Sequence, residues 1–442
     1  MYKTKEEVFE RAEEVVGKPF RLFEKSEEYL VQSKGSVGNL IQEEHFGTAV
    51  NSRPEADFVE IGVELKVTPY RQITKGYTAK ERLVLNIIDY KKEAFSAFNT
   101  SSFWTKNNTL LILFYEYKPL IPRTEWFISH VYLWEIANDP ELRQIKDDWE
   151  YIHQKIMSGY AHELSEGQTM YLGACTKGKD SSSVRQQPAS DVLAKQRAYS
   201  IKPSYMSVIL AEVMSGTRTS LPRISSENSF NAFESKILTE VHRYVGRSQR
   251  ALIELFGLSS SSKSVNAMLI ARMLGLNGVS VNKTAEFIQA GIVTKTIVVG
   301  RNQHIKEHMS FPAFNFIELS HEAEWEASSI GTYLSTTKFF FVVFQKDEND
   351  EPILRGVRFW SMPVPDLARY EIVWQKAVSA VQQSNLSMLP KGSDNLIGHV
   401  RPHAQNSDDA LPLPDGTLAT KRCFWLNNTY TVEIIREFLQ TS

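Results

Sequence analysis

The stretch KGSVGNLIQEEHFGTAVNSRPEADFVEIGVELKVTP, residues 34–69, decides both the fold and the chemistry of this chain. Three apolar residues alternate with polar ones near its end: Val63, Leu65 and Val67. This period of two is typical of a β-strand with one buried face, so it places Glu64 and Lys66 together on the opposite face. Asp57 precedes Glu64 closely enough for a turn to bring the two carboxylates side by side.

Two carboxylates and an amine on one polar face suit metal-dependent hydrolysis of a phosphodiester. The carboxylates offer the hard oxygen ligands that Mg²⁺ prefers, and an ammonium group can orient or deprotonate the attacking water. The spacing alone also fits a solvated strand face with an ion pair, since Glu-x-Lys recurs at Glu116/Lys118 and Glu234/Lys236. The pattern therefore leaves both interpretations open.

The composition excludes several classes of protein. With 442 residues, 42% of them hydrophobic and 23% charged, the chain can form two or three cored domains and is neither disordered nor fibrous. Its 50 basic and 52 acidic residues give a formal charge of −2, which excludes a histone-like basic coat but permits a local basic groove.

The cysteines and the apolar runs indicate where the protein works. Cys175 and Cys423 are too few for a disulfide framework or a four-cysteine zinc site. The N-terminus is charged throughout and no run of about 18 apolar residues occurs, so we expect a cytoplasmic protein with no membrane partner.

Hydrophobic periodicity predicts alternating helices and strands. In the first half, helices are expected within residues 1–30 and at 36–46 and 142–157, and strands at 57–69, 82–88, 109–117 and 126–134. Apolar periodicity is lost at 213–228, where we place a domain boundary. The second half is expected to begin with helices at 229–257 and 264–274 and to end with strands, including Phe339–Phe344.

The two halves resemble each other. Shifted by 229 residues, DFVEIGVELKV (57–67) aligns with EFIQAGIVTKT (286–296). Shifted by 225 residues, Trp149 falls on Trp374 and RAYSIKPSY (197–205) on RCFWLNNTY (422–430). Ordered matches of this kind predict two copies of one fold. The copies differ at a telling position, because Glu64 falls on Val293.

The stretch 34–69 resembles the active-site region of the MutH family, which includes the nicking endonucleases of mismatch repair and type II restriction endonucleases. The similarity continues through nearly the whole chain and is strongest to the restriction enzymes that cut before the G of GATC. The motifs that carry it are KERLVLNIIDY, TSSFWTKNNTLLILFYEY, AHELSEGQTMYL, DVLAKQRAYS, FFFVVFQKDENDE, GHVRPH, LPDG and FWLNNTY.

The resemblance implies roles for particular residues. The metal-binding Asp of the family matches Asp57, its metal-binding Glu matches Glu64, and its catalytic Lys matches Lys66. A second catalytic Lys falls on Lys106 in TSSFWTK, where it would touch a phosphate; a loop-end lysine without function is the alternative.

A further Glu of the family, on the helix before Asp57, is ambiguous in this chain. Counting back from Gly47 selects Glu43, whereas counting forward from Lys34 selects Gln42, because the helix contains one extra residue. We choose Glu43 as the catalytic residue, since a neutral amide cannot replace an ionised carboxylate at a metal or a water.

The resemblance also implies residues that contact DNA. The turn at Lys34 and Gly35 matches a turn that clamps the DNA backbone, and RAYSIKPSY matches a segment that contributes to site recognition. Arg197, Tyr199 and Lys202 are therefore the DNA-binding candidates, with a core position for Tyr199 as an equal alternative.

Together these observations predict an α/β (α+β) protein with two MutH-like folds in tandem, each a mixed central sheet flanked by helices. Residues 1–215 would be the catalytic domain, 216–225 a linker, and 226–442 a degenerate domain that binds effector DNA.

The resemblance implies the activity of a type II restriction endonuclease making Mg²⁺-dependent double-strand cuts at GATC with 5′ four-base overhangs. Two copies of the site and dimerisation on DNA are expected in the functional complex. A mismatch-repair nickase and a non-catalytic DNA-binding regulator are the alternatives.

Overall fold

The computed structural model describes residues 2–32, 36–50, 53–178, 182–218, 220–224, 230–259, 264–394, 396–404, 406 and 408–439. Contacts within the chain separate two compact units. The first comprises Met1–Leu221 with Asn228–Phe230 and Ile288–Gly291, and the second comprises Pro222–Glu227, Asn231–Phe287 and Ile292–Ser442.

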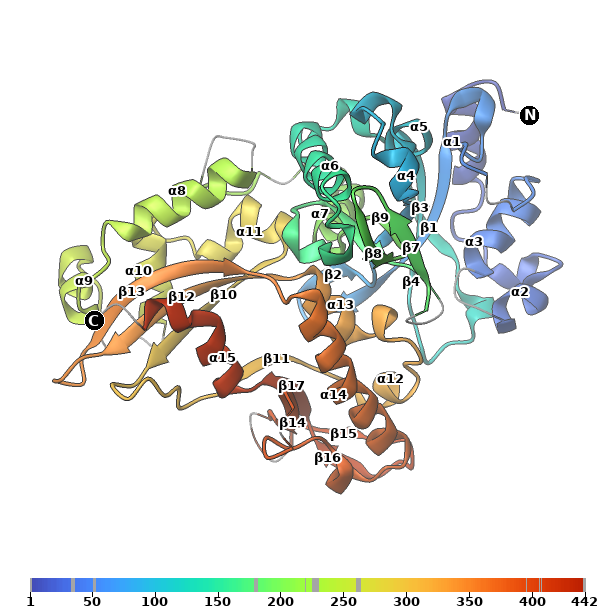
Figure 1. The fold of residues 1–442 in the computed structure, drawn as a ribbon. Helices are drawn as coiled ribbons and strands as arrows, with labels where there is room; N and C mark the ends of the chain where they lie inside the picture. Colours follow the sequence, from blue (N-terminus) through green and yellow to red (C-terminus); the bar gives the residue numbers. More distant parts are fainter. Residues whose placement is uncertain are drawn as a thin grey trace. The chain divides into compact units, whose positions relative to one another are not determined.

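The first unit is built on a four-stranded sheet in the order β2-β1-β4-β5 (Figure 1). Its strands are β1 (Glu64–Ile73), β2 (Gly76–Ala79), β4 (Thr109–Glu116) and β5 (Ile128–Glu135). β1 runs parallel to β4, with Glu64 opposite Leu110, and β5 is antiparallel to β4. The active-site sequence therefore begins a central strand of this sheet.

A second sheet in this unit has the order β3-β9-β6, formed by β3 (Leu83–Ile87), β9 (Arg197–Ile201) and β6 (Leu172–Thr176). A hairpin, β7 (Val184–Gln187) and β8 (Ser190–Lys195), precedes β9. The helices are α1 (Lys5–Glu13), α2 (Ser26–Gln32), α3 (Ser36–Leu40), α4 (Tyr90–Glu93), α5 (Ser102–Asn107), α6 (Leu142–Met157) and α7 (Pro203–Ser215).

One face of the four-stranded sheet packs against the N-terminal helices. Val8 and Ala12 of α1 lie in the same buried cluster as Val63, Leu65 and Leu111. The apolar side of the predicted alternation thus faces the core, which leaves Glu64 and Lys66 on the other face of β1.

The second unit repeats the order of three of these strands, β1-β4-β5, as β10-β12-β13. β10 (Ile292–Val299) is parallel to β12 (Lys338–Lys346), which is antiparallel to β13 (Pro352–Trp360). A second sheet has the order β11-β17-β14, formed by β11 (Met309–Ala313), β17 (Arg422–Leu426) and β14 (Gly398–Pro402). β15 (Ala410–Pro412) and β16 (Leu418–Thr420) form a hairpin.

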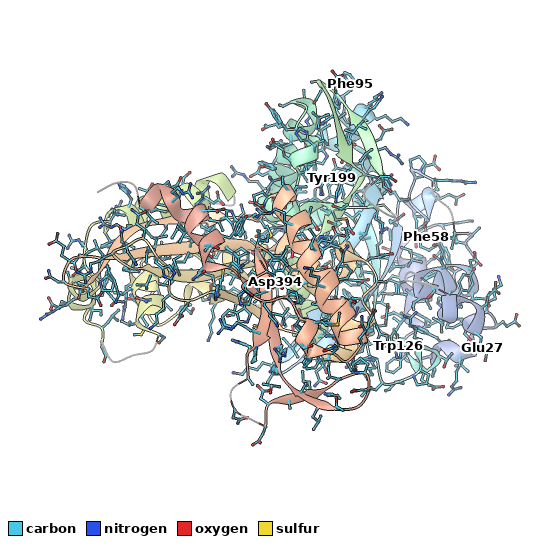
Figure 2. All side chains as sticks on the ribbon, turned by 60° about the horizontal axis from the view of Figure 1, so that its bottom comes forward. Glu27, Phe58, Phe95, Trp126, Tyr199 and Asp394 are labelled. Atoms are coloured by element: carbon cyan, nitrogen blue, oxygen red, sulfur yellow. The ribbon has the colours of Figure 1, made fainter. Side chains whose placement is uncertain are left out.

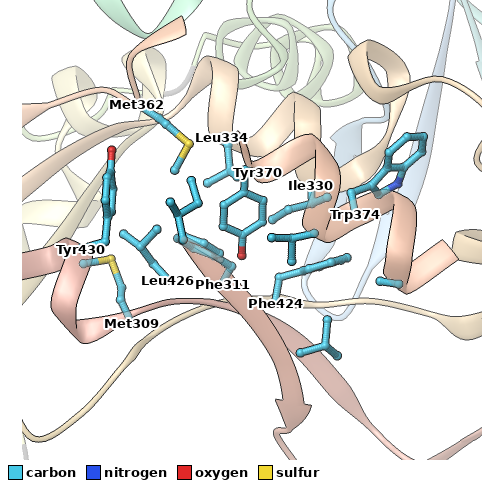
Figure 3. Packing of buried hydrophobic residues seen from close by; sticks show 14 of the residues in the cluster. Met309, Phe311, Ile330, Leu334, Met362, Tyr370, Trp374, Phe424, Leu426 and Tyr430 are labelled. Carbon is cyan, nitrogen blue, oxygen red and sulfur yellow. The ribbon is translucent and has the colours of Figure 1, made fainter. Parts of the chain in front are cut away.

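The second half also supplies eight of the described helices. These are α8 (Phe230–His242), α9 (Gln249–Phe256), α10 (Val265–Met273), α11 (Ala285–Ala290), α12 (Phe316–Ser320), α13 (Ser329–Thr336), α14 (Val364–Gln382) and α15 (Asn428–Ile435). Figure 3 shows the core between α13, α14 and the second sheet, where Tyr370 packs near Phe311 and Phe424.

The two units agree in register as well as in strand order. Glu64 pairs with Leu110 in the first unit, and Val293 pairs with Phe339 in the second, so both members of the pair are displaced by the same interval. In the second sheets the pairs Leu172–Ile201 and Gly398–Leu426 correspond to within one residue. The prediction of two mixed α/β folds in tandem is confirmed.

A shared polar contact explains why the two tryptophans align. Trp149 on α6 donates from its indole nitrogen to Glu93 Oε1 at 3.0 Å, and Trp374 on α14 donates to Glu322 Oε2 at 2.7 Å. Each glutamate also accepts hydrogen bonds from the first residue of the helix before the central strand, Ser102 in α5 or Ser329 in α13. A glutamate thus links a tryptophan on one helix to the start of another helix in both units.

Most predicted elements are present, with one correction. The predicted strand 57–69 begins only at Glu64, because the preceding residues form a 3-10 turn, Val59–Ile61, and a tight reversal. No helix among the described residues is long and apolar enough to span a membrane.

Candidate active site

A reversal of the chain brings Asp57 back beside the start of β1. Phe58 and Val63 exchange backbone hydrogen bonds of 2.9 and 3.3 Å across this reversal. Gly62 has φ +63°, a left-handed conformation that a residue with a Cβ adopts only with strain. The reversal therefore depends on Gly62 and converts a separation in sequence into contact between two carboxylates.

Each of the two carboxylates accepts a hydrogen bond from a backbone N–H group. The backbone N–H of Asp57 donates to Glu64 Oε2 at 3.1 Å, and the N–H of Leu65 donates to Asp57 Oδ2 at 3.1 Å. Glu64 is only 3% exposed, while Asp57 is half-buried. The pair is thus held on rigid backbone and is open from the side of Asp57.

Two lysines converge on Glu64. Lys66 Nζ donates to Glu64 Oε1 at 2.9 Å, and Lys106 Nζ lies 3.6 Å from Glu64 Oε2. Lys106, in the last turn of α5, also donates to the carbonyl oxygens of Arg53 and Glu55 at 2.9 Å each. The structure therefore brings together four of the predicted site residues: Asp57, Glu64, Lys66 and Lys106.

Burial and a neighbouring negative charge raise the pKa of the Asp57 carboxyl group. Desolvation, followed by the neighbouring Glu64 charge, raises the pKa of Asp57 to about 6, although Lys66 and Lys106 oppose the shift. Two carboxylates this close disfavour each other's ionised form, so the pair gains from a cation placed between them and the solvent.

The oxygens of Asp57 and Glu64 match the ligands that Mg²⁺ prefers. Within the described part of the chain, no group of three or more His, Cys, Asp or Glu residues is arranged to hold a metal ion. Mg²⁺ commonly uses one or two carboxylates and completes its shell with water and phosphate oxygens, so the two carboxylates fit a magnesium site that DNA completes.

The predicted catalytic role of Glu43 is not supported, because its side chain points elsewhere. Glu43 accepts a hydrogen bond from the Tyr29 hydroxyl at 2.5 Å and lies 3.4 Å from Lys25 Nζ, and these contacts hold the pKa of Glu43 below its usual value. Gln42 instead donates to Asp57 Oδ1 at 3.2 Å. The side chain that contacts Asp57 is thus the one selected by counting forward from Lys34.

The DNA-binding candidates Arg197 and Lys202 require a second correction, and Tyr199 occupies the core position that was its equal alternative. Tyr199 and Lys202 have no exposed surface and Arg197 is 3% exposed. Arg197 donates to the carbonyl of Ala174 at 2.7 Å, and the Tyr199 hydroxyl donates to Glu93 at 2.8 Å. These buried contacts hold the second sheet and are not available to DNA in this structure.

Figure 2 shows the difference between such a core position and a surface one. Tyr199 lies within the fold, whereas Phe95, which is 91% exposed, projects from its margin. Lys34 and Gly35, the turn predicted to clamp the DNA backbone, lie outside the described residues.

The equivalent place in the second unit lacks the carboxylate pair. Val293 stands where Glu64 stands in the first unit, and Lys295, at the position of Lys66, donates to the carbonyl of Ser310 at 2.8 Å. Burial lowers the pKa of Lys295. The second unit therefore keeps the strand and its lysine without the counterpart of Glu64.

Comparisons with known proteins agree with this division. A family model described as DNA mismatch repair enzyme MutH matches residues 46–148, which lie in the first unit and include Asp57, Glu64, Lys66 and Lys106. The type II restriction enzyme Sau3AI of Staphylococcus aureus is 37% identical over 489 aligned positions, which cover 99% of this chain and 99% of that protein. The chain belongs to the MutH-related type II restriction endonucleases.

MutH proteins match only part of this restriction endonuclease. The MutH of Shewanella woodyi is 29% identical and covers 47% of this chain and 92% of its own length, and the MutH of Escherichia coli O139:H28 is 25% identical and covers 42% and 80%. The duplicated length thus separates this enzyme from the mismatch-repair branch. It is a site-specific endonuclease whose partner is DNA.

Sequence reasoning considered Gln42 for the site but preferred Glu43. The extra residue in the helix was visible in the sequence. The number of residues alone, however, does not show at which position a helix accommodates an insertion. The structure locates it in the π-helical turn Ile41–His45.

Proposed function

We propose that this restriction endonuclease cuts both strands of DNA at GATC, depends on Mg²⁺ and leaves 5′ four-base overhangs. The observation that carries the proposal is the carboxylate pair Asp57 and Glu64 with the amines of Lys66 and Lys106 beside it. The sequence of the site is proposed from the resemblance in motifs described above.

The residues of this site divide the work of hydrolysis. Asp57 and Glu64 would hold Mg²⁺, which when bound supplies positive charge at the scissile phosphate and favours deprotonation of water. Lys66 is placed to orient the attacking water against the phosphate, since its ammonium is held by Glu64 at the strand surface. Lys106 offers a second ammonium group to the phosphate in the transition state.

We further propose that the second unit binds a second copy of the site as an effector. A pocket of about 910 Å³ next to Lys295 supports this role. Its lining contains more basic than acidic side chains, with Lys295, Arg301, Lys306 and Lys346 against Glu307 and Asp350. A cleft of this charge attracts a phosphate backbone.

A palindromic site also requires two cuts, and each chain has one Asp57–Glu64 pair. Two chains acting together on DNA, or one chain acting twice, satisfy this requirement. We propose dimerisation on DNA that carries two sites, because the second unit then serves to hold the additional copy.

Supercoiled plasmid that contains mapped GATC sites tests the proposal. The wild-type chain is incubated with Mg²⁺ or with EDTA, and the ends of the products are sequenced. Linear fragments with four-base 5′ GATC ends, formed only with Mg²⁺, are expected. Nicked circles alone, cutting at another sequence, or cutting in EDTA would each contradict a named part of the proposal.

A further inference from the structure

The helix before the carboxylate pair contains a π-helical turn. α3 ends at Leu40 and continues as the π turn Ile41–His45, in which the N–H of Phe46 bonds to the carbonyl of Ile41 at 3.2 Å. Such turns accommodate one extra residue within an α-helix and often occur at functional sites. This agrees with the extra residue counted between Lys34 and Gly47.

The π turn selects which side chain faces Asp57. Gln42 is 9% exposed, and its amide nitrogen lies 3.2 Å from Asp57 Oδ1 and 3.4 Å from the carbonyl oxygen of Ala49. Both partners are acceptors, so the amide is oriented with its N–H₂ group toward them. Glu43 points to Lys25 and Tyr29.

Gln42 contacts the oxygen of Asp57 that the backbone does not hold. The N–H of Leu65 holds Oδ2 and the Gln42 amide holds Oδ1. A carboxylate fixed at both oxygens cannot rotate, which favours a single geometry toward a ligand.

A glutamine here also affects the charge of the site. The contacts join Asp57 and Glu64 with Lys66 and Lys106, two carboxylates against two ammonium groups. A carboxylate in place of Gln42 would add a third negative charge beside Asp57, whereas the amide adds a donor and no charge.

We propose that Gln42 is a positioning residue, which donates to Asp57 from the π turn and holds this carboxylate ready for the divalent cation. The inference deepens the proposed function and rests on it, since it assigns Asp57 to the metal. In this interpretation, the amide of Gln42 takes the place that a helix carboxylate has in the family.

The test compares Gln42→Met, which keeps the length of the side chain and removes the donor, with the wild-type chain. Gln42→Leu serves as a second donor-free variant, and Glu44→Gln, in the same π turn, is the matched control. The first readout is the Mg²⁺ concentration for half-maximal single-turnover cleavage of a GATC duplex. The second is the dissociation constant of Mn²⁺ from the protein–DNA complex, measured by electron paramagnetic resonance under conditions that prevent turnover.

Both donor-free variants should need roughly 10- to 100-fold more Mg²⁺ and bind Mn²⁺ more weakly by a similar factor, the usual cost of losing a contact to a metal ligand. The rate at saturating Mg²⁺ should change less than the half-maximal concentration. Glu44→Gln should leave both readouts unchanged.

Three results would overturn the inference while leaving the proposed function intact. The first is wild-type metal dependence in both donor-free variants. The second is a raised metal requirement in Glu43→Gln but not in Gln42→Met, and the third is loss of cooperative unfolding in both donor-free variants, which would make Gln42 structural. If instead the wild-type chain failed to cleave with Mg²⁺, the proposed function itself would fall and the inference with it.

Discussion

Replacing Glu64 by Gln should abolish cleavage while the protein still folds and binds DNA. The change keeps the shape of a side chain that is 3% exposed and removes its charge. In the wild-type chain Lys66 Nζ and Lys106 Nζ lie 2.9 and 3.6 Å from the Glu64 carboxylate. In the variant Asp57 is the remaining carboxylate of the four-residue site, so its net charge changes from neutral to about +1.

The size of the effect follows from the lost attraction for the cation. Two unit charges about 4 Å apart interact by about 4 kcal/mol near a protein surface, so a divalent ion loses about 8 kcal/mol of gross attraction. The Gln carbonyl and water restore part of this. If half remains lost, the barrier rises by about 4 kcal/mol and the rate falls about 1000-fold.

The assay is single-turnover cleavage of a GATC duplex at a fixed Mg²⁺ concentration that half-saturates the wild-type chain, with binding measured separately in Ca²⁺, which we expect to support binding without cleavage. Glu60→Gln is the matched control, because Glu60 is exposed in the adjacent 3-10 turn. Asp57→Asn should fail in the same way as Glu64→Gln. A Glu64→Gln rate within tenfold of wild type would refute the assignment of the active site.

Three further results are expected. A chain with both Glu64→Gln and Val293→Glu should stay inactive in the plasmid assay. Lys295 donates to a backbone carbonyl, and the loops of the second unit need not present a phosphate to the new carboxylate. Mg²⁺-dependent cutting by this chain would contradict the prediction. A plasmid with two GATC sites should be cut faster than one with a single site, and Lys306→Glu, which reverses a pocket charge, should reduce the difference; equal initial rates would remove the effector role. Glu93→Gln should lower the free energy of unfolding by about 2 kcal/mol in urea titrations, because this 1%-exposed carboxylate accepts several buried hydrogen bonds. An unchanged urea midpoint would show that these hydrogen bonds do not stabilise the fold.

The fold was accessible from the sequence because its signals are local and repeated. The alternation around Glu64 fixed which face of β1 is buried, and the ordered matches between the halves predicted a duplication that the strand registers confirm. Glu64 and Lys66 share a face by the geometry of any strand, so their contact needed no tertiary information.

The failures arise where tertiary packing decides. Whether Glu43 or Gln42 faces Asp57 depends on the π turn, which adds a residue without changing the apolar pattern. Arg197 and Lys202 look like surface cations in the sequence, but the carbonyls of Ala174 and Thr169 accept their hydrogen bonds inside the fold. Sequence shows charge but not the acceptors that make its burial tolerable.

The second unit shows that fold and chemistry are carried by different residues in this enzyme. The glutamate that joins a tryptophan to a helix start is kept in both units, as Glu93 and as Glu322, whereas Glu64, to which we assign the metal, is replaced by Val293. Loss of that one charge removes both the proposed metal ligand and the repulsion that a carboxylate exerts on DNA phosphate, while Lys295 remains in the lining of the basic pocket. We infer that such a strand face suits a site that holds DNA and leaves it intact, which is what an effector site requires.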